Sequence, residues 1–424
     1  MAMFPHLRLR EGAGPLLDLP WERPLADWSR AGIRFRDLPV GPSRHLVRFL
    51  VTDSHVHALK ELPLGVASRE YAVLRHLEED DLPAVRAVGI AEAPERGAAI
   101  LVTEFLAHSL QYRRLLSRFP AGPHPYRDRL LDAMAWLLVD LHRSGVYWGD
   151  CSLANTLFRR DGDTIQAYLV DAETSEVHPT LSDGQRRADL EILVENVAFG
   201  LADLAALQGR LTLDDDDPIQ AAEAVRTRYL EVWSELVATP LLEATDRHAV
   251  RARIRRLNDL GFVVSEVELE PGSDGQRVQL RVAVATRDFH AKRLRERTGV
   301  RALEGQARLL LNDLREYAVW VEADSGRPLS PEEGAVRWLA EVYRPTVDRI
   351  AAAVGPSRDL VQAYCDVLEH KWLASERAGR DVGLEAAIAS YLAAGAPAPE
   401  PSPDEGTALD VETIVSVELE ELPS

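Results

Sequence analysis

Three polar side chains within residues 142–173 have the types and spacing that phosphoryl transfer requires. Asp150 and Asn155 form a D-x-x-x-x-N pattern after an apolar helical segment, and Asp171 ends a strand-like apolar run. Such a reaction needs one carboxylate that orients an acceptor hydroxyl and takes its proton. It also needs an amide and a second carboxylate to hold magnesium on nucleotide phosphates, and hard oxygen ligands suit that ion. We therefore expect Asp150 to act as the base, with Asn155 and Asp171 as magnesium ligands.

Each of these residues, taken alone, also suits a loop or a turn, because Asp and Asn favour such places in any fold. The alternative loses weight when the residues are considered together. The turn Asp161-Gly162-Asp163 lies between Asn155 and Asp171 and predicts a hairpin that brings its two ends side by side. A helix, a catalytic loop and a hairpin are thus the elements expected to position this set.

The same stretch resembles the protein-kinase-like superfamily, and most closely its lipopolysaccharide-kinase-like branch. The matching residues are His142-x-x-Gly145, Gly149-Asp150, Asn155 and Asp171-Ala172-Glu173. The resemblance implies an α+β chain with a two-lobed kinase-like fold, and ATP and Mg²⁺ as cofactors.

The stretch also departs from the protein-kinase pattern at two motifs. Trp148-Gly149-Asp150 stands where protein kinases have His-Arg-Asp, and Asp171-Ala172-Glu173 stands where they have Asp-Phe-Gly. The missing Arg argues against activation by a phosphorylated loop. The Phe-Gly pair is also missing, although the metal-binding Asp is present. Its absence weakens the expectation that this motif switches between an inward and an outward position.

Three strand-like segments, at residues 33–40, 45–51 and 56–62, predict a meander that suits the small lobe of such a fold. Lys60 ends the sequence His57-Ala58-Leu59-Lys60, which resembles the V-A-I-K element whose lysine contacts the α- and β-phosphates. The alternative is an exposed strand lysine, the commonest environment of that residue.

Glu70 is the predicted ion-pair partner of Lys60. It follows Ser68, which is able to cap a helix, so Glu70 would lie in the first turns of that helix. Glu61 is the competing carboxylate. Because neighbouring strand residues point to opposite faces, we expect Glu61 to point away from the site.

Further nucleotide contacts are expected at two positions of the small lobe. The turn from Gly41 to Arg44 would lie over the phosphates and bind them through backbone amides and the Arg44 side chain; a plain hairpin turn is the alternative. The apolar run at residues 100–105 includes Glu104 and would lead to the hinge, where backbone groups take the adenine edge. No side chain there is diagnostic.

Two amphipathic segments, at residues 126–144 and 188–207, predict long helices of a large lobe. Asp189 lies near the start of the second segment. The resemblance implies that this carboxylate fastens the catalytic loop, and a charge at a helix end is the alternative.

The part after residue 240 predicts a small α+β module at 243–300 and a helical region at 304–393, with breaks at Gly326-Arg327-Pro328, Arg344-Pro345 and Gly355-Pro356. Together with the kinase-like half it resembles an uncharacterised bacterial family, domain-of-unknown-function family 4032. Its arginine-rich helices, near 247–256 and 287–301, are expected to dock on the acidic kinase-like part or to bind an anionic ligand, with solvated helix faces as the alternative. An apolar seam would assist docking, and the candidates are Trp320, Trp338 and Trp372.

Composition limits the possible partners and the compartment. The chain has 424 residues, 46% hydrophobic, and a net charge of −19, which argues against nucleic acid or an anionic membrane surface as the principal partner. Two distant cysteines favour a reducing compartment, and no apolar window reaches the length of a membrane span. We expect a cytoplasmic protein.

The expected organisation is an N-terminal arm, a small lobe, a large lobe, a C-terminal α+β/helical domain and a disordered acidic tail, at residues 1–32, 33–106, 107–240, 241–394 and 395–424. The leading hypothesis is a phosphotransferase that uses Lys60, Glu70 and Asp150 on an unidentified hydroxyl acceptor. The alternative is a pseudokinase-like regulatory or scaffold protein, which the missing glycines and the altered motifs motivate.

Overall fold

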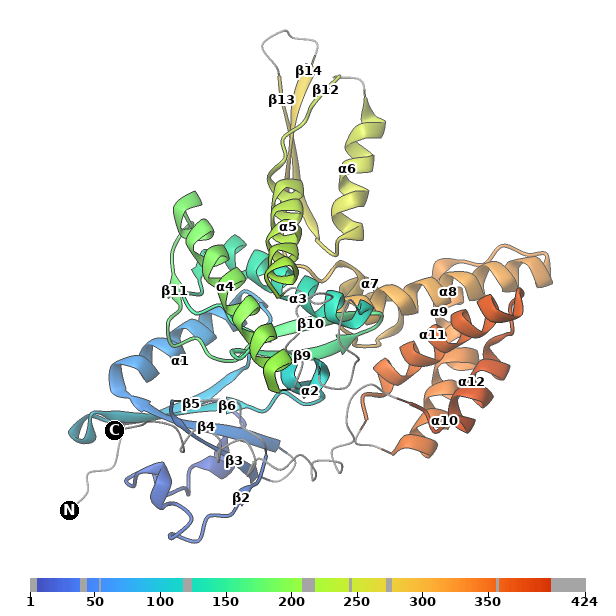
Figure 1. Ribbon diagram of the computed structural model, residues 1–424. Coiled ribbons are helices and arrows are strands. Elements are labelled where there is room, and N and C mark those ends of the chain that lie inside the picture. The colour runs from blue at the N-terminus through green and yellow to red at the C-terminus, as the bar shows by residue number, and fades with distance from the viewer. Residues whose placement is uncertain are drawn as a thin grey trace.

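A computed structural model gives the architecture of the chain (Figure 1). The residues that it describes are 6–38, 44–52, 55–116, 124–207, 218–243, 246–271, 277–355 and 358–397. Figure 1 shows a sheet-based small lobe, a helical large lobe, an upright strand-and-helix module and a separate group of C-terminal helices. The expected α+β class with two kinase-like lobes is confirmed.

The small lobe is built on a six-stranded antiparallel sheet in the order β1-β5-β6-β4-β3-β2, which is larger than the expected meander. Its strands are β1 (His6–Leu9), β2 (Phe35–Arg36), β3 (Leu46–Thr52), β4 (His55–Pro63), β5 (Ala87–Ala93) and β6 (Ala98–Glu104). Helix α1 (Leu64–Glu79) packs on one face of this sheet through side chains such as Leu74 and Leu77. That face also contributes to the core shared with the large lobe.

The N-terminal segment covers the other face of the sheet. Trp21 and Trp28 are fully buried there, meet edge to face at 5.1 Å between ring centroids, and pack with Leu59 and Ile100 of the sheet. Burying side chains of this size is worth about 1.5–3 kcal/mol each. The segment also supplies β1, so it is part of the small lobe's core.

Glu61 lies on this outer face, as the strand alternation predicted. Its carboxylate accepts a hydrogen bond from the backbone N–H of Leu25 at 3.0 Å. The helix that carries Glu70, however, begins at Leu64 and not at Ser68. Pro63 ends β4 and directly precedes the first turn, while the Ser68 hydroxyl donates back to the carbonyl of Leu64 at 3.0 Å. The capping role expected for Ser68 was therefore wrong.

The large lobe is formed mainly by α3 (Pro125–Arg143), α4 (Asp183–Leu207) and α5 (Pro218–Val237), with the short α2 (Tyr112–Leu116) beside them. The predicted apolar stripe of α3 is buried in the main core, as Leu130, Met134, Leu137, Leu138 and Leu141. Two small sheets complete the lobe: β7 (Ser109–Leu110) with the hairpin β9 (Thr156–Asp161) and β10 (Thr164–Leu169), and β8 (Val146–Tyr147) with β11 (Glu176–Val177).

The C-terminal part begins with the predicted α+β module. A three-stranded sheet runs in the order β12-β14-β13 and carries α6 (Arg247–Asp259). Its strands are β12 (Leu241–Glu243), β13 (Val264–Pro271) and β14 (Arg277–Val284). Figure 1 shows this module standing out from the large lobe beside the end of α5.

The helical region comprises α7 (Phe289–Thr298), α8 (Glu304–Ser325), α9 (Pro331–Trp338), α10 (Arg344–Val354), α11 (Leu360–Ala378) and α12 (Leu384–Ala393). The break expected at Arg344-Pro345 is absent. A π-helical turn, Leu339–Tyr343, leads directly into α10 and places Pro345 in its first turn, where a missing N–H is tolerated. None of the helices in the described ranges combines the length and apolarity that crossing a bilayer would require.

The expected tryptophan seam was wrong. Trp320 and Trp372 are each 62% exposed, and Trp338 is buried in the core of the helical region itself, beside Tyr343 and Tyr364. Hydrophobic periodicity predicts which face of a helix is buried but not which element covers it. It therefore did not distinguish the buried Trp338 from the exposed Trp320 and Trp372.

Another set of residues joins the C-terminal part to the large lobe. Trp136 of α3 contacts Phe262 at 6.0 Å between centroids, and the Arg287 guanidinium lies 4.6 Å from the Trp136 ring. Arg256 of the basic helix α6 reaches Glu235 of α5 at 3.4 Å, and Arg253 pairs with the same carboxylate. The docking expected of the arginine-rich helices is thus confirmed for these two side chains.

Candidate active site

Lys60 is the centre of an ion-pair cluster between the two lobes. Its Nζ atom lies 2.8 Å from Oδ2 of Asp171 and 3.3 Å from Oε2 of Glu70. Glu70 is almost completely buried on α1, and its Oε1 atom also accepts from the backbone N–H of Ala172 at 3.4 Å. The helix of the small lobe, the strand β4 and the segment after β10 therefore meet at one point.

The electrostatics of this cluster follow from its burial. Burial alone would lower the pKa of Lys60, but the carboxylates of Glu70 and Asp171 together raise it. Burial raises the pKa of Glu70 to about 7, and the ammonium of Lys60 only partly offsets this effect. Lys60 is therefore charged, with Asp171 as its closer partner, while Glu70 changes its protonation state near neutral pH.

Glu173 adds a third carboxylate beside Lys60 that the sequence reasoning did not assign to the site. Its Oε2 atom lies 3.8 Å from the Lys60 ammonium and 3.2 Å from Nε2 of His45. His45 follows the turn that was expected to cover the phosphates. The contact therefore joins the residue that precedes β3 to the segment that carries Asp171.

The catalytic-loop residues lie together on the large-lobe side. The side-chain amide of Asn155 donates to Oδ2 of Asp150 at 3.0 Å and to the Asp150 carbonyl at 3.1 Å. Asn196 of α4 donates to Oδ1 of Asp150 at 3.4 Å and to the Cys151 carbonyl at 2.9 Å. These two amides hold the Asp150 carboxylate from both of its oxygens.

Asn196 was not identified from the sequence, although a signal was present. It lies seven residues after Asp189, which places both side chains on the same face of α4. The seven-residue spacing from Asp189 therefore indicated that Asn196 also faces the catalytic loop.

Asp189 fastens the catalytic loop, as the resemblance implied. Its fully buried carboxylate accepts from the backbone N–H groups of Trp148 at 2.6 Å and Gly149 at 2.8 Å, and contacts Nε2 of His142 at 3.1 Å. Gly149 has a φ of 82°, and a Cβ there would lie 2.9 Å from the Thr174 carbonyl oxygen. Only glycine fits this turn without strain, so a larger residue at this position would disturb the loop before Asp150.

The remaining predicted nucleotide contacts are less defined. Gly41 lies outside the described residues. Arg44 is exposed and adjoins His45, whose contact with Glu173 sets this end of the turn beside the Lys60 cluster. Glu104 ends β6, and its carboxylate faces Arg86 at 3.7 Å, so a role in adenine binding would fall to the backbone that follows it.

Asn155 and Asp171 are of residue types that would suit a magnesium ion. The backbone N–H of Val170 donates to the Asn155 carbonyl at 3.1 Å, so Asn155 and Asp171, which follows Val170, lie at the open end of one hairpin. The Asn155 amide nitrogen is turned to Asp150, which leaves its side-chain oxygen as the donor on the other side. One amide and one carboxylate oxygen suffice for an ion that keeps several waters. Within the described residues no cluster of three or more His, Cys, Asp or Glu forms a metal cage.

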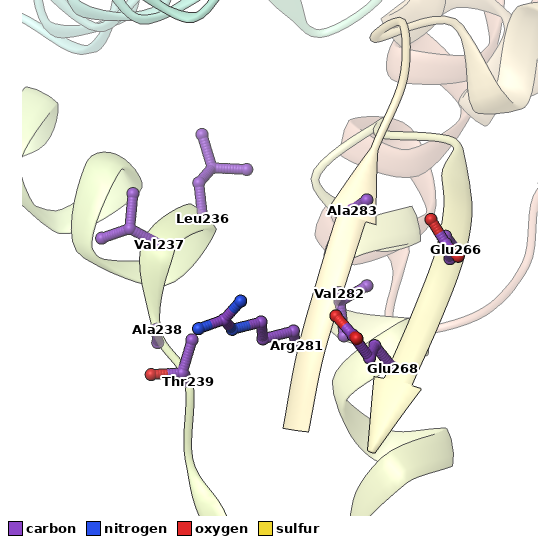
Figure 2. A pocket seen from close by; sticks show the side chains of 9 residues that line it. All are labelled: Leu236, Val237, Ala238, Thr239, Glu266, Glu268, Arg281, Val282 and Ala283. Carbon is purple, nitrogen blue, oxygen red and sulfur yellow. The ribbon is translucent and has the colours of Figure 1, made fainter. Parts of the chain in front are cut away.

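A surface hollow of about 270 Å³ lies elsewhere, between the end of α5 and strands β13 and β14. Figure 2 shows Arg281 extending from β14 toward Thr239, with Glu266 and Glu268 on the neighbouring strand. None of the predicted site residues lines this hollow, so we assign it no part in the chemistry.

Two family patterns match the chain. The lipopolysaccharide kinase (Kdo/WaaP) family matches residues 43–209, which include all the described residues of the Lys60 and Asp150 clusters. The chain carries a lipopolysaccharide-kinase-family domain. A second family, a domain of unknown function (DUF4032), matches residues 231–395, so the kinase-family domain is followed by a DUF4032 domain.

Relatives of the kinase-family domain are distant. Lipopolysaccharide core heptose(I) kinase WaaP of Pseudomonas aeruginosa is 27% identical over 142 residues, which are 31% of this chain and 53% of that protein. The chain thus spans about half the length of this curated relative.

Solved structures show the same distance. WaaP in complex with acyl carrier protein is 19% identical with a TM-score of 0.37, and the match covers 60% of this chain and 98% of that one. The Mycobacterium tuberculosis PknI kinase domain is 16% identical with a TM-score of 0.28, and the match covers 46% and 98%.

Proposed function

We propose that the chain is an ATP- and Mg²⁺-dependent phosphotransferase that transfers the γ-phosphoryl group to a hydroxyl. The observation that carries this proposal is the convergence of Lys60, Glu70 and Asp171 at 2.8–3.3 Å across the lobe boundary. Lys60 would hold nucleotide phosphates, Asp171 and Asn155 would hold magnesium, and magnesium would neutralise charge on the phosphates. Asp150 would orient the acceptor hydroxyl and accept its proton.

The kinase family supports a sugar or lipid-linked hydroxyl as the acceptor. The relative in Pseudomonas aeruginosa is named for a core heptose of lipopolysaccharide. We propose an acceptor of this class without extending that particular sugar to this chain. The expected compartment remains the cytoplasm, with both cysteines buried and free of disulfides.

The pseudokinase alternative is less well supported. A scaffold would have no need to keep a charged Lys60 in contact with Asp171 at 2.8 Å while two amides hold Asp150. Replacing a buried ion pair with apolar residues is often neutral or stabilising, so a chain without phosphotransfer chemistry would have no reason to keep the Lys60 cluster.

ATP with magnesium should raise the melting temperature of the wild type, and Asp171→Ala should remove most of the shift. Ligand that binds only the folded state stabilises it by mass action, and Asp171 is a proposed metal ligand. The measurement is a thermal shift with millimolar ATP, with and without Mg²⁺.

The matched control is Asp203→Ala. Asp203 is an aspartate of α4 whose ion-pair partner, Arg113, lies outside the Lys60 cluster. This variant should shift as the wild type does. If the wild type itself shows no magnesium-dependent shift, the proposed function is wrong.

Affinity for Mg²⁺-ATP should rise as the pH increases from about 6 to 8, the window around a pKa of about 7 for Glu70. Below that pKa Glu70 is protonated and attracts Lys60 only weakly; above it the carboxylate holds the ammonium in place. Glu70→Gln should bind with an affinity that is flat across this window, measured by calorimetry. A variant that retains the wild-type pH profile would show that another group titrates.

A further inference from the structure

The β9–β10 hairpin links the two proposed metal ligands and is held at its other end by the DUF4032 domain. Asn155 precedes β9 and Asp171 follows β10, and the two strands are paired along six residues each. At about 3.4 Å per residue, the tip lies roughly 20 Å from the metal ligands.

The tip of the hairpin is held by buried hydrogen bonds. The Asp161 carboxylate accepts from the N–H groups of Gly305 at 2.9 Å and Gln306 at 2.7 Å, at the N-terminus of α8. Gln362 of α11 pairs with the backbone of Gly162 in both directions, accepting from its N–H at 2.8 Å and donating to its carbonyl at 2.9 Å. These side chains are at most 5% exposed.

The approach of the two parts at the tip is too close for larger residues. A Cβ at Gly305 would lie 2.3 Å from the Asp161 carbonyl oxygen, and one at Gly162 would lie 2.9 Å from Gly305. Burial raises the pKa of Asp161 to about 6, so at neutral pH its anion is held by the helix N-terminus and its two N–H groups. The tip is therefore fixed in position and not merely covered.

The sides of the hairpin are held as well. Arg160 reaches Asp366 at 2.7 Å with both side chains buried, and Arg159 donates to Asp359 at 2.8 Å. On β10, Gln166 accepts from Arg287 at 2.8 Å. Both strands are thus fastened to the DUF4032 domain between the tip and the metal ligands.

We infer that the DUF4032 domain sets the relative position of Asn155 and Asp171 through this hairpin, with Asp161 and Gln362 as positioning residues. Burial of polar groups makes the register specific, because a shifted hairpin would remove the buried hydrogen bonds that Asp161 and Gln362 make across the contact. The roles of Asn155 and Asp171 rest on the proposed function, but the mechanical coupling does not.

Hydrogen exchange of the full-length protein, without nucleotide or metal, tests the coupling. The reporter is the peptide at residues 167–173, which contains the Val170 N–H bonded to the Asn155 carbonyl. The reference is the core strand β6, residues 98–104, so that a global loss of stability affects both peptides and cancels in their ratio. Gln362→Ala should raise this ratio by about tenfold, the scale expected for the loss of the two buried hydrogen bonds that reach Gly162.

Asp161→Asn gives an independent reading with a side chain of the same size, and it decides the outcome if Gln362→Ala does not fold. Arg308→Ala is the control, since Arg308 pairs with Asp163 at the exposed rim of the tip and should leave the ratio unchanged. Gln362→Ala should also need about tenfold more Mg²⁺ for a half-maximal ATP shift, with metal-free nucleotide binding unchanged.

A wild-type ratio in both Gln362→Ala and Asp161→Asn would overturn the inference. This result is distinct from failure of the proposed function, which would appear as a wild type that does not respond to ATP and Mg²⁺ whatever its exchange ratio.

Discussion

Asp150→Asn should lower turnover by about a hundredfold or more, the usual scale for removing a catalytic base, while affinity for ATP stays near the wild-type value. Asn keeps the size of the side chain and an oxygen that can accept from Asn155, so the loop geometry should survive. ADP release in the steady state, measured beside ATP affinity by calorimetry, separates the two effects.

Asp203→Ala again serves as the control and should turn over as the wild type does, because its carboxylate pairs with Arg113 on the surface. Unchanged turnover in Asp150→Asn would remove Asp150 from its proposed role. Joint loss of turnover and ATP affinity would instead indicate that the loop itself had been disturbed.

The fragment of residues 1–240 should be much less heat-stable than the full chain and prone to aggregate. It would expose the apolar surface around Trp136, separate Arg160 from Asp366 and separate Asp161 from the N–H groups of Gly305 and Gln306. Removing one partner of a buried ion pair costs about 3–5 kcal/mol, a large share of the roughly 5–15 kcal/mol that stabilises a typical domain. Thermal melting and size-exclusion chromatography measure the effect.

A chain that ends at residue 397 is the matched control, because it removes only part of the Pro-rich, acidic tail that the sequence predicts to be disordered. It should melt close to the full chain. A fragment of residues 1–240 that is soluble, monomeric and as heat-stable as the full chain would show that the two parts are independent modules, and the hairpin coupling would fail with it.

Much of the site was accessible from local sequence pattern. Strand alternation separated Lys60 from Glu61, the apolar periodicity of α3 located the helix before Asp150, and a turn sequence located the hairpin between Asn155 and Asp171. Each of these inferences depends on neighbours within about one or two turns of the chain. Their catalytic roles remain predictions.

Contacts between distant segments were not accessible in this way. The spacing of Asn196 from Asp189 indicates a shared helix face but not that its amide reaches Asp150, and nothing near Gln362 indicates that it pairs with Gly162. The sequence predicts an N-terminal arm but not which surface its tryptophans cover, and the structure places them in the small lobe's core. An aromatic residue in a sequence indicates that a side chain is often buried, but it does not indicate which surface buries it. The predicted tryptophan seam was wrong for the same reason.

The grip on the hairpin tip also bears on how the protein is made. Gly162 and Gln362 are separated by 200 residues, so their contact has a high contact order and a large entropy of loop closure. During translation the whole kinase-family domain would leave the ribosome before Gln362, which holds the tip of the hairpin, was synthesised. In a nascent chain the Asp161 carboxylate would therefore still lack the hydrogen bonds that it accepts in the folded protein. Asn155 and Asp171 would reach their final positions only after α11 had been translated. A chain that terminated before α11 would contain every proposed catalytic residue but would lack the contacts that hold the hairpin tip in place.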